Sequence, residues 1–69
     1  MDKFAYFELY YLNLQLISAD IRVSNPAYMA WVATEQTHYD QYGKPRYKRY
    51  GTFKIIKHRW NKAKFPTKR

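Results

Sequence analysis

The residues best suited to chemistry follow one another between positions 44 and 64. Over residues 44–50 cations and phenols alternate, in the order Lys-Pro-Arg-Tyr-Lys-Arg-Tyr. Lysine and arginine displace the counterions that condense on phosphates, and a tyrosine ring stacks on an unpaired base for about 1–3 kcal/mol. The same cations also pair with the carboxylates of an acidic protein surface. The run therefore predicts an anionic partner.

The candidate nucleic-acid contacts all carry positive charge, an imidazole or a phenol. They are Lys44, Arg46, Tyr47, Lys48, Arg49, Tyr50, Lys54, Lys57, His58, Arg59, Lys62 and Lys64. The cations are expected to contact phosphates, and the two tyrosines to stack on bases. In the alternative interpretation the tyrosines are core anchors and the cations form a solvated face.

The charge of the chain is strongly divided between its two parts. The 69 residues contain 13 Lys and Arg against 5 Asp and Glu, so the formal net charge is +8. Residues 1–43 sum to −3, whereas residues 44–69 contain eleven bases and no acid and sum to +11. Such an asymmetry is typical of chains that bind nucleic acid or another anionic surface.

Catalytic and metal-binding patterns are weak. His38 and His58 are the only histidines, and no cysteine accompanies them. Neither the spacing of zinc ligands nor a catalytic motif is present, so we expect no cofactor and no enzymatic activity. A small ribonuclease that uses His58 and Arg59 at a scissile phosphate is the remaining enzymatic alternative.

Three segments would have to position these residues. Alternating apolar and polar residues over 12–24, with one slip of phase, predict extended structure with a bulge. Asn25 or Ser24 as N-cap, Pro26, and Gly43 as a stop predict a helix near 26–42, although a strand and hairpin compete there. A basic amphipathic helix with Thr52 as its N-cap is predicted near 52–64. The expected fold is α+β, and the alternative is an all-α three-helix bundle.

The second half contains Gly-Lys-Pro-Arg at 43–46 and Gly-Thr-Phe at 51–53, followed by the predicted amphipathic helix. This order of residues resembles the end of AP2-type and integrase arm-binding DNA domains. It implies a three-stranded sheet on duplex DNA backed by that helix. The helix caps around 26–42 conflict with those strands, and we do not assign the chain to the family.

The sequence predicts one small domain over residues 1–64 and a flexible basic tail over 65–69. No apolar stretch is long enough for a membrane span, and no secretory signal is evident, so a soluble cytoplasmic protein is expected. The predicted function is non-enzymatic nucleic-acid binding in an accessory or regulatory role, as in a small viral or plasmid-encoded factor. The alternative is an inhibitor or adaptor that docks on an acidic surface of a larger protein. Aromatic residues near the N-terminus also raise the possibility of a homo-oligomer.

Overall fold

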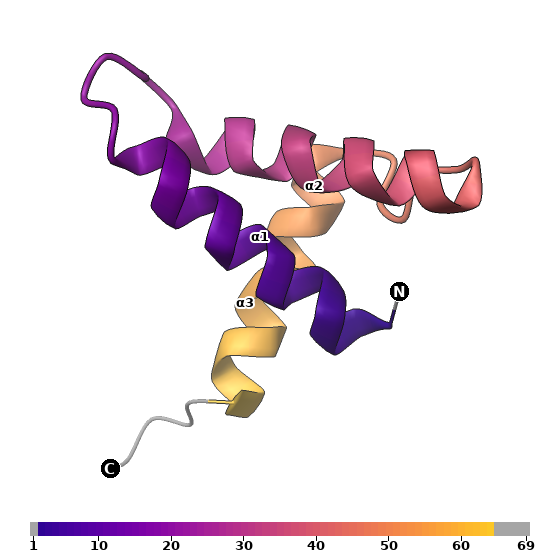
Figure 1. Cartoon of the computed structure of the whole chain (residues 1–69). Coiled ribbons are helices and arrows are strands. Elements are labelled where there is room, and N and C mark those ends of the chain that lie inside the picture. Colours follow the sequence, from indigo (N-terminus) through magenta and orange to yellow (C-terminus); the bar gives the residue numbers. More distant parts are fainter. Residues whose placement is uncertain (1, 65–69) are drawn as a thin grey trace, which may run out of the picture.

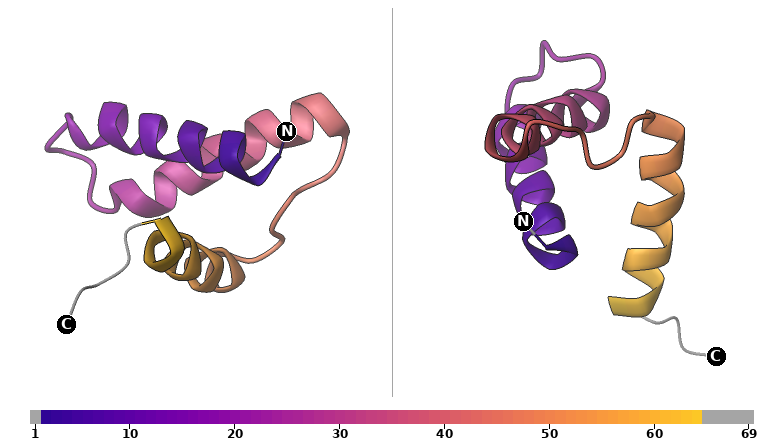
Figure 2. Two further views of the ribbon diagram at one scale, coloured as in Figure 1. Left: turned by 90° about the horizontal axis from the view of Figure 1, so that it is seen from below. Right: turned by 90° about the vertical axis from the view of Figure 1, so that its right-hand side faces the viewer.

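Three helices make up the fold. The computed structural model describes residues 2–64, except for the side chain of Lys64. Helix α1 spans Lys3–Ser18, α2 spans Pro26–Tyr42 and α3 spans Tyr50–Lys64, and residues 2–64 contain no strand. Helices α1 and α2 run in roughly opposite directions, and α3 crosses behind α1 (Figure 1, Figure 2). The expected α+β class is therefore wrong, and the three-helix alternative describes the chain. The described residues also lack the sheet that the AP2-type resemblance requires.

The extended structure predicted over 12–24 is wrong, because most of that segment belongs to α1. Two polar residues of the predicted extended segment have clear positions in the helical structure. Asn13 faces α2 and donates from Nδ2 to Thr34 Oγ1 at 3.0 Å, whereas Asp20 lies beyond the helix in the loop that joins α1 to α2. The apparent alternation was coincidental, since Leu12 and Leu16 are both exposed.

The helix predicted near 26–42 is confirmed with its caps. The side chain of Asn25 accepts a hydrogen bond from the Tyr28 backbone N–H at 3.3 Å, and Pro26 opens the first turn. Gly43 ends the helix with φ of 72°, a left-handed conformation that glycine adopts without steric cost. The strand and hairpin alternative for this segment is therefore wrong.

The basic C-terminal helix is also confirmed, but it begins two residues earlier than predicted. The Arg49 carbonyl accepts from the Phe53 backbone N–H at 3.1 Å, so Thr52 lies inside the first turn and is not the N-cap. Phe53 is fully buried and Trp60 is half-buried, as the predicted apolar stripe requires. The tail predicted over 65–69 lies outside the described residues.

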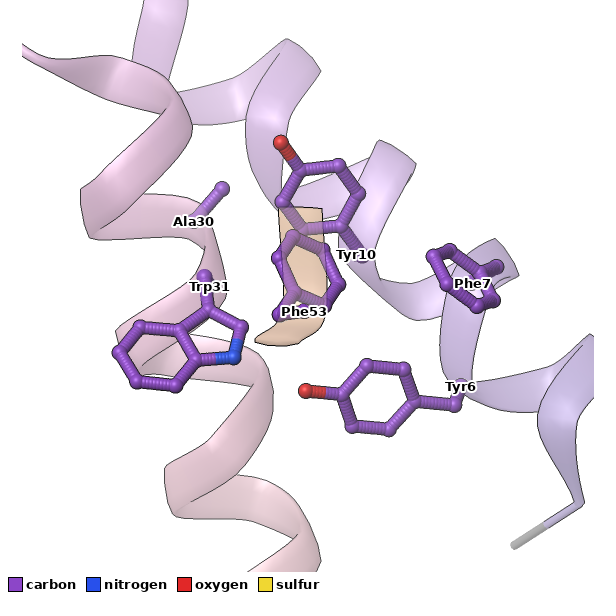
Figure 3. Close-up of a cluster of buried hydrophobic side chains, with 6 residues drawn as sticks. All are labelled: Tyr6, Phe7, Tyr10, Ala30, Trp31 and Phe53. Atoms are coloured by element: carbon purple, nitrogen blue, oxygen red, sulfur yellow. The ribbon is translucent and has the colours of Figure 1, made fainter. Parts of the chain in front are cut away.

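The core is almost entirely aromatic, and Phe53 lies at its centre (Figure 3). The Phe53 ring centroid is 4.8 Å from that of Tyr10, 5.6 Å from that of Phe7 and 6.2 Å from that of Trp31. Because these rings come from all three helices, one side chain of α3 joins α1 to α2. The buried apolar residues are Tyr6, Phe7, Tyr10, Ala30, Trp31 and Phe53.

The carboxylate of Glu35 on α2 fixes the connector, residues 43–49, that leads to α3. It accepts hydrogen bonds from the backbone N–H groups of Arg46 and Tyr47, each at 3.0 Å. It also accepts from the phenol of Tyr6 on α1. Burial and this hydrogen bond raise the pKa of the Tyr6 phenol well above its usual range. A single carboxylate thus ties the path of the connector to the first two helices.

Candidate functional site

The outer face of α3 carries a row of basic side chains. Lys54, His58 and Lys62 follow one another at intervals of four residues, which places them along one side of a helix. All three are exposed, and so is the adjacent Arg59. Ile55 lies beside this row with 56% of its surface exposed. We call Lys54, His58, Arg59 and Lys62 the basic face.

No carboxylate of the described chain neutralises the basic face. Within residues 2–64, its four side chains take part in no ion pair, while Arg22 pairs with Asp20 at 3.0 Å in the first loop. The ammonium of Lys54 lies 5.5 Å from the centroid of the Tyr50 ring, a contact that orients the cation without cancelling its charge. The basic face is therefore available to an external anion.

Two of the predicted contacts are half-buried. The Lys57 ammonium lies 5.7 Å from the centroid of the Tyr10 ring. The Arg46 guanidinium lies 5.7 Å from the ring centroids of both Tyr6 and Tyr47. These cations pack on the aromatic core as well as reaching its edge, so they are less accessible than the basic face.

The remaining cations of the connector are exposed. They are Lys44, Lys48 and Arg49. The backbone carbonyl of Lys44 is 2.8 Å from Nδ1 of His38, and this contact holds the start of the connector against α2. The last predicted contact, Lys64, ends α3, and its side chain lies outside the described residues.

Tyr47 and Tyr50 pack inward. The Tyr47 ring centroid is 5.3 Å from that of Tyr6. The Tyr50 ring centroid is 5.1 Å from that of Tyr28 and 5.3 Å from that of Trp31. Both side chains are half-buried, as expected for core anchors. Stacking on bases stays a prediction for these rings, and it competes with the packing contacts.

The two histidines lie in different environments. His38 is buried on α2, with 6% of its surface exposed, and its ring is near those of Tyr6 and Tyr42. His58 is exposed on α3. In the part of the chain that the structure describes, no three His, Cys, Asp or Glu side chains come together to hold a metal ion. The absence of enzymatic activity stays a prediction.

A hollow of about 770 Å³ lies between α1 and α3, and the sequence analysis missed it. Phe7, Tyr11, Leu12 and Trp60 form its apolar surface. The Tyr11 phenol donates to Asn61 Oδ1 at 2.9 Å across the two helices.

The polar lining of the hollow comes from the same two helices. Glu8 and Gln15 of α1 and Asn61 of α3 complete it. Residues 8, 11, 12 and 15 have the spacing of one helix face, which is the sequence signal for this surface. The alternation over 12–24 predicts extended structure there and so hides that signal. We call this hollow, with its seven lining residues, the α1–α3 groove.

Comparison of the chain with protein-family models, curated proteins and solved structures gives no match. Among residues 2–64, none of the three helices is long and apolar enough to cross a bilayer. The site must therefore be interpreted from its own geometry and charge.

Proposed function

We propose that this protein is a non-enzymatic adaptor or inhibitor that docks through α3 on an acidic surface of a larger protein. The observation that carries the proposal is the composition of the basic face. Its cations are exposed and unpaired within the described chain, and an exposed isoleucine, Ile55, lies among them. Protein interfaces combine apolar contacts with charges at the rim.

The inward packing of Tyr47 and Tyr50 also favours a protein partner over nucleic acid. With Tyr47 and Tyr50 packed on the core, the basic segment would bind single strands mainly through phosphate contacts, which carry no sequence information. The apolar α1–α3 groove, next to α3, adds a surface that suits side chains of a protein better than phosphates. An acidic partner would also relieve the repulsion among eleven cations in residues 44–69.

Affinity capture with two charge-matched variants tests the proposal. Lys54→Glu with Lys62→Glu reverses the basic face, whereas Lys3→Glu with Arg22→Glu makes the same change in net charge outside α3. Wild type and the second variant should retain the same protein partner from nuclease-treated cell extract, and the first should lose it. Equal capture by both variants, or capture that nuclease abolishes, would contradict the proposal.

Nucleic-acid binding through the same cations is the second candidate, favoured by the absence of any acid in residues 44–69. It predicts binding to unrelated duplex DNA, single-stranded DNA and RNA, with affinity that falls steeply as salt rises. Gel-shift assays at several salt concentrations measure this. No binding to any of the three at low salt would contradict it.

The proposal includes an intracellular location, in the cytoplasm, as the sequence predicts. Fractionation of cells that express a tagged chain would check it, and recovery of the chain outside the cells would contradict it.

A further inference from the structure

The α1–α3 groove has an apolar floor, and basic side chains of α3 lie along one edge of it. Asn61 is the groove residue of α3 beside Trp60. His58 and Lys57 precede Asn61 by three and four residues, and Lys54 by seven, so these side chains share one side of the helix. Trp60 and Asn61 are the α3 residues that line the groove, and the cations Lys54 and Lys57 lie at its α3 edge, on the same side of the helix as Asn61.

The opposite wall, formed by α1, is mainly neutral. Gln15 and the half-exposed Leu12 line it, and Glu8 supplies its one charge. A ligand lying in the groove would meet cations on the α3 side and apolar or polar side chains on the α1 side. The groove is asymmetric in charge, and this asymmetry selects the ligand.

We propose that the α1–α3 groove binds an amphipathic helix of the partner protein, with leucine-like side chains on the floor and acidic side chains toward α3. This inference rests on the proposed function and names the kind of segment that the partner presents. A volume of about 770 Å³ lies in the upper part of the range of about 300–1,000 Å³ typical of ligand sites. An amphipathic helix enters such a groove with apolar anchors at i, i+3 or i+4, and i+7.

The charge of the walls decides between possible occupants. A basic helix would be repelled by Lys54 and Lys57. A strongly apolar helix would bring no carboxylate to these cations, so the cations would add nothing to its affinity. An acidic amphipathic helix satisfies both the floor and the wall, so it is the occupant that the groove fits.

Peptide binding to the full chain tests the inference. The probe is a labelled acidic peptide of about 15 residues with leucines at i, i+4 and i+7, and a control peptide has lysine in place of each glutamate. Fluorescence anisotropy should show binding of the acidic peptide, and the control should bind about tenfold or more weakly. Equal binding of the two peptides, or no binding of the acidic one, would overturn the inference.

Two exposed leucines of α1 provide a matched pair of variants. Leu12 lines the groove, whereas Leu16 does not, and their exposed fractions are 52% and 65%. Leu12→Glu should weaken the acidic peptide about tenfold or more, and Leu16→Glu should leave it within about twofold. Equal weakening by both variants would overturn the inference, because their net charges are the same.

This experiment separates the inference from the proposed function. Suppose that partner capture depends on Lys54 and Lys62 but is unchanged by Leu12→Glu. This result would overturn the inference about the groove and leave the docking role of α3 in place. A short DNA duplex that displaces the acidic peptide equally from wild type and from the Leu12→Glu variant would also overturn the groove, since the peptide would then sit on the basic face. If unlabelled peptide displaces the labelled peptide from wild type and the DNA duplex does not, the result would support binding in the groove.

Discussion

Helices α2 and α3 both send aromatic side chains into the same core, yet their outer faces differ completely. Trp31 of α2 and Phe53 of α3 lie within one cluster. Residues 26–42 contain no lysine or arginine, and the exposed face of α2 carries tyrosines, apolar side chains, and neutral or acidic polar side chains. The exposed face of α3 carries Lys54, His58 and Lys62.

This difference shows how a small chain separates stability from binding. The inner face of α3 packs on the core through the fully buried Phe53 and the half-buried Tyr50 and Trp60, whereas the side chains of its basic face make no ion pair within residues 2–64. Charge can therefore accumulate on the outer face with little cost to stability. The predictions below alter first the inner contacts and then the outer ones.

The largest effect is expected from Phe53→Ala, which removes the ring that joins the three helices. Loss of a buried phenylalanine costs about 3–5 kcal/mol, and the core of so small a domain rarely supplies more than about 3–5 kcal/mol. The variant should be largely unfolded at 25 °C by far-ultraviolet circular dichroism. A cooperative transition close to that of wild type would show that α3 is not held by this ring.

Glu35→Ala comes next, because it removes the acceptor for two backbone N–H groups and the Tyr6 phenol. Leaving such donors unpaired costs about 1–3 kcal/mol. Urea denaturation should show this loss, and faster amide exchange at Arg46 and Tyr47 should accompany it. Gln36→Ala on the same helix is the control. Similar losses in both variants would contradict a specific role of the Glu35 carboxylate.

Tyr10→Phe should change the free energy of unfolding little at pH 7. It should reduce the loss of stability that wild type shows at alkaline pH. The buried Tyr10 hydroxyl has no hydrogen-bond partner among residues 2–64, so its removal should be neutral or stabilising by about 1 kcal/mol or less. Burial raises the pKa of Tyr10 to about 12, above the value of about 10 for an unfolded chain.

The sign of this pH effect follows from linkage. The Tyr10 contribution to stability is fully present below pH of about 10, where both states keep the proton, and it is lost between about 10 and about 12 as the unfolded state ionises first. Denaturation at pH 8 and pH 11 should show a smaller fall for Tyr10→Phe than for wild type. An identical fall would contradict the raised pKa.

The smallest effect on stability is expected from the reversal of the basic face. Lys54 and Lys62 are exposed and make no ion pair within residues 2–64, so Lys54→Glu with Lys62→Glu should shift the free energy of unfolding by about 0.5 kcal/mol or less per site. Urea denaturation checks this. A loss of the size expected for Glu35→Ala would show that the outer face supports the fold.

The second and third helices could be predicted from sequence because their signals are local. Asn25, Pro26 and Gly43 delimit α2, and a basic amphipathic pattern after Gly51 indicates α3. The first helix could not be predicted in this way, because its polar residue Asn13 finds its hydrogen-bond acceptor, Thr34, on another helix. Chance alternation then favoured a strand.

The candidate site also has features that the sequence predicts and features that it does not predict. The accumulation of cations beyond residue 43 is readable from sequence, and most of them prove to be exposed. The packing of Tyr47 against Tyr6 depends on contacts between distant segments. The groove likewise needs α1 and α3 side by side, which no local pattern indicates.

Nuclear magnetic resonance of the full chain during titration with a short poly-glutamate peptide tests the central claim most directly. Because carboxylates should settle on the basic face, we expect the largest changes in the amide and side-chain signals of Lys54, His58 and Lys62, and small changes at Lys3 and Arg22. Changes that are largest on α2, or equal at all cations of the chain, would contradict the account.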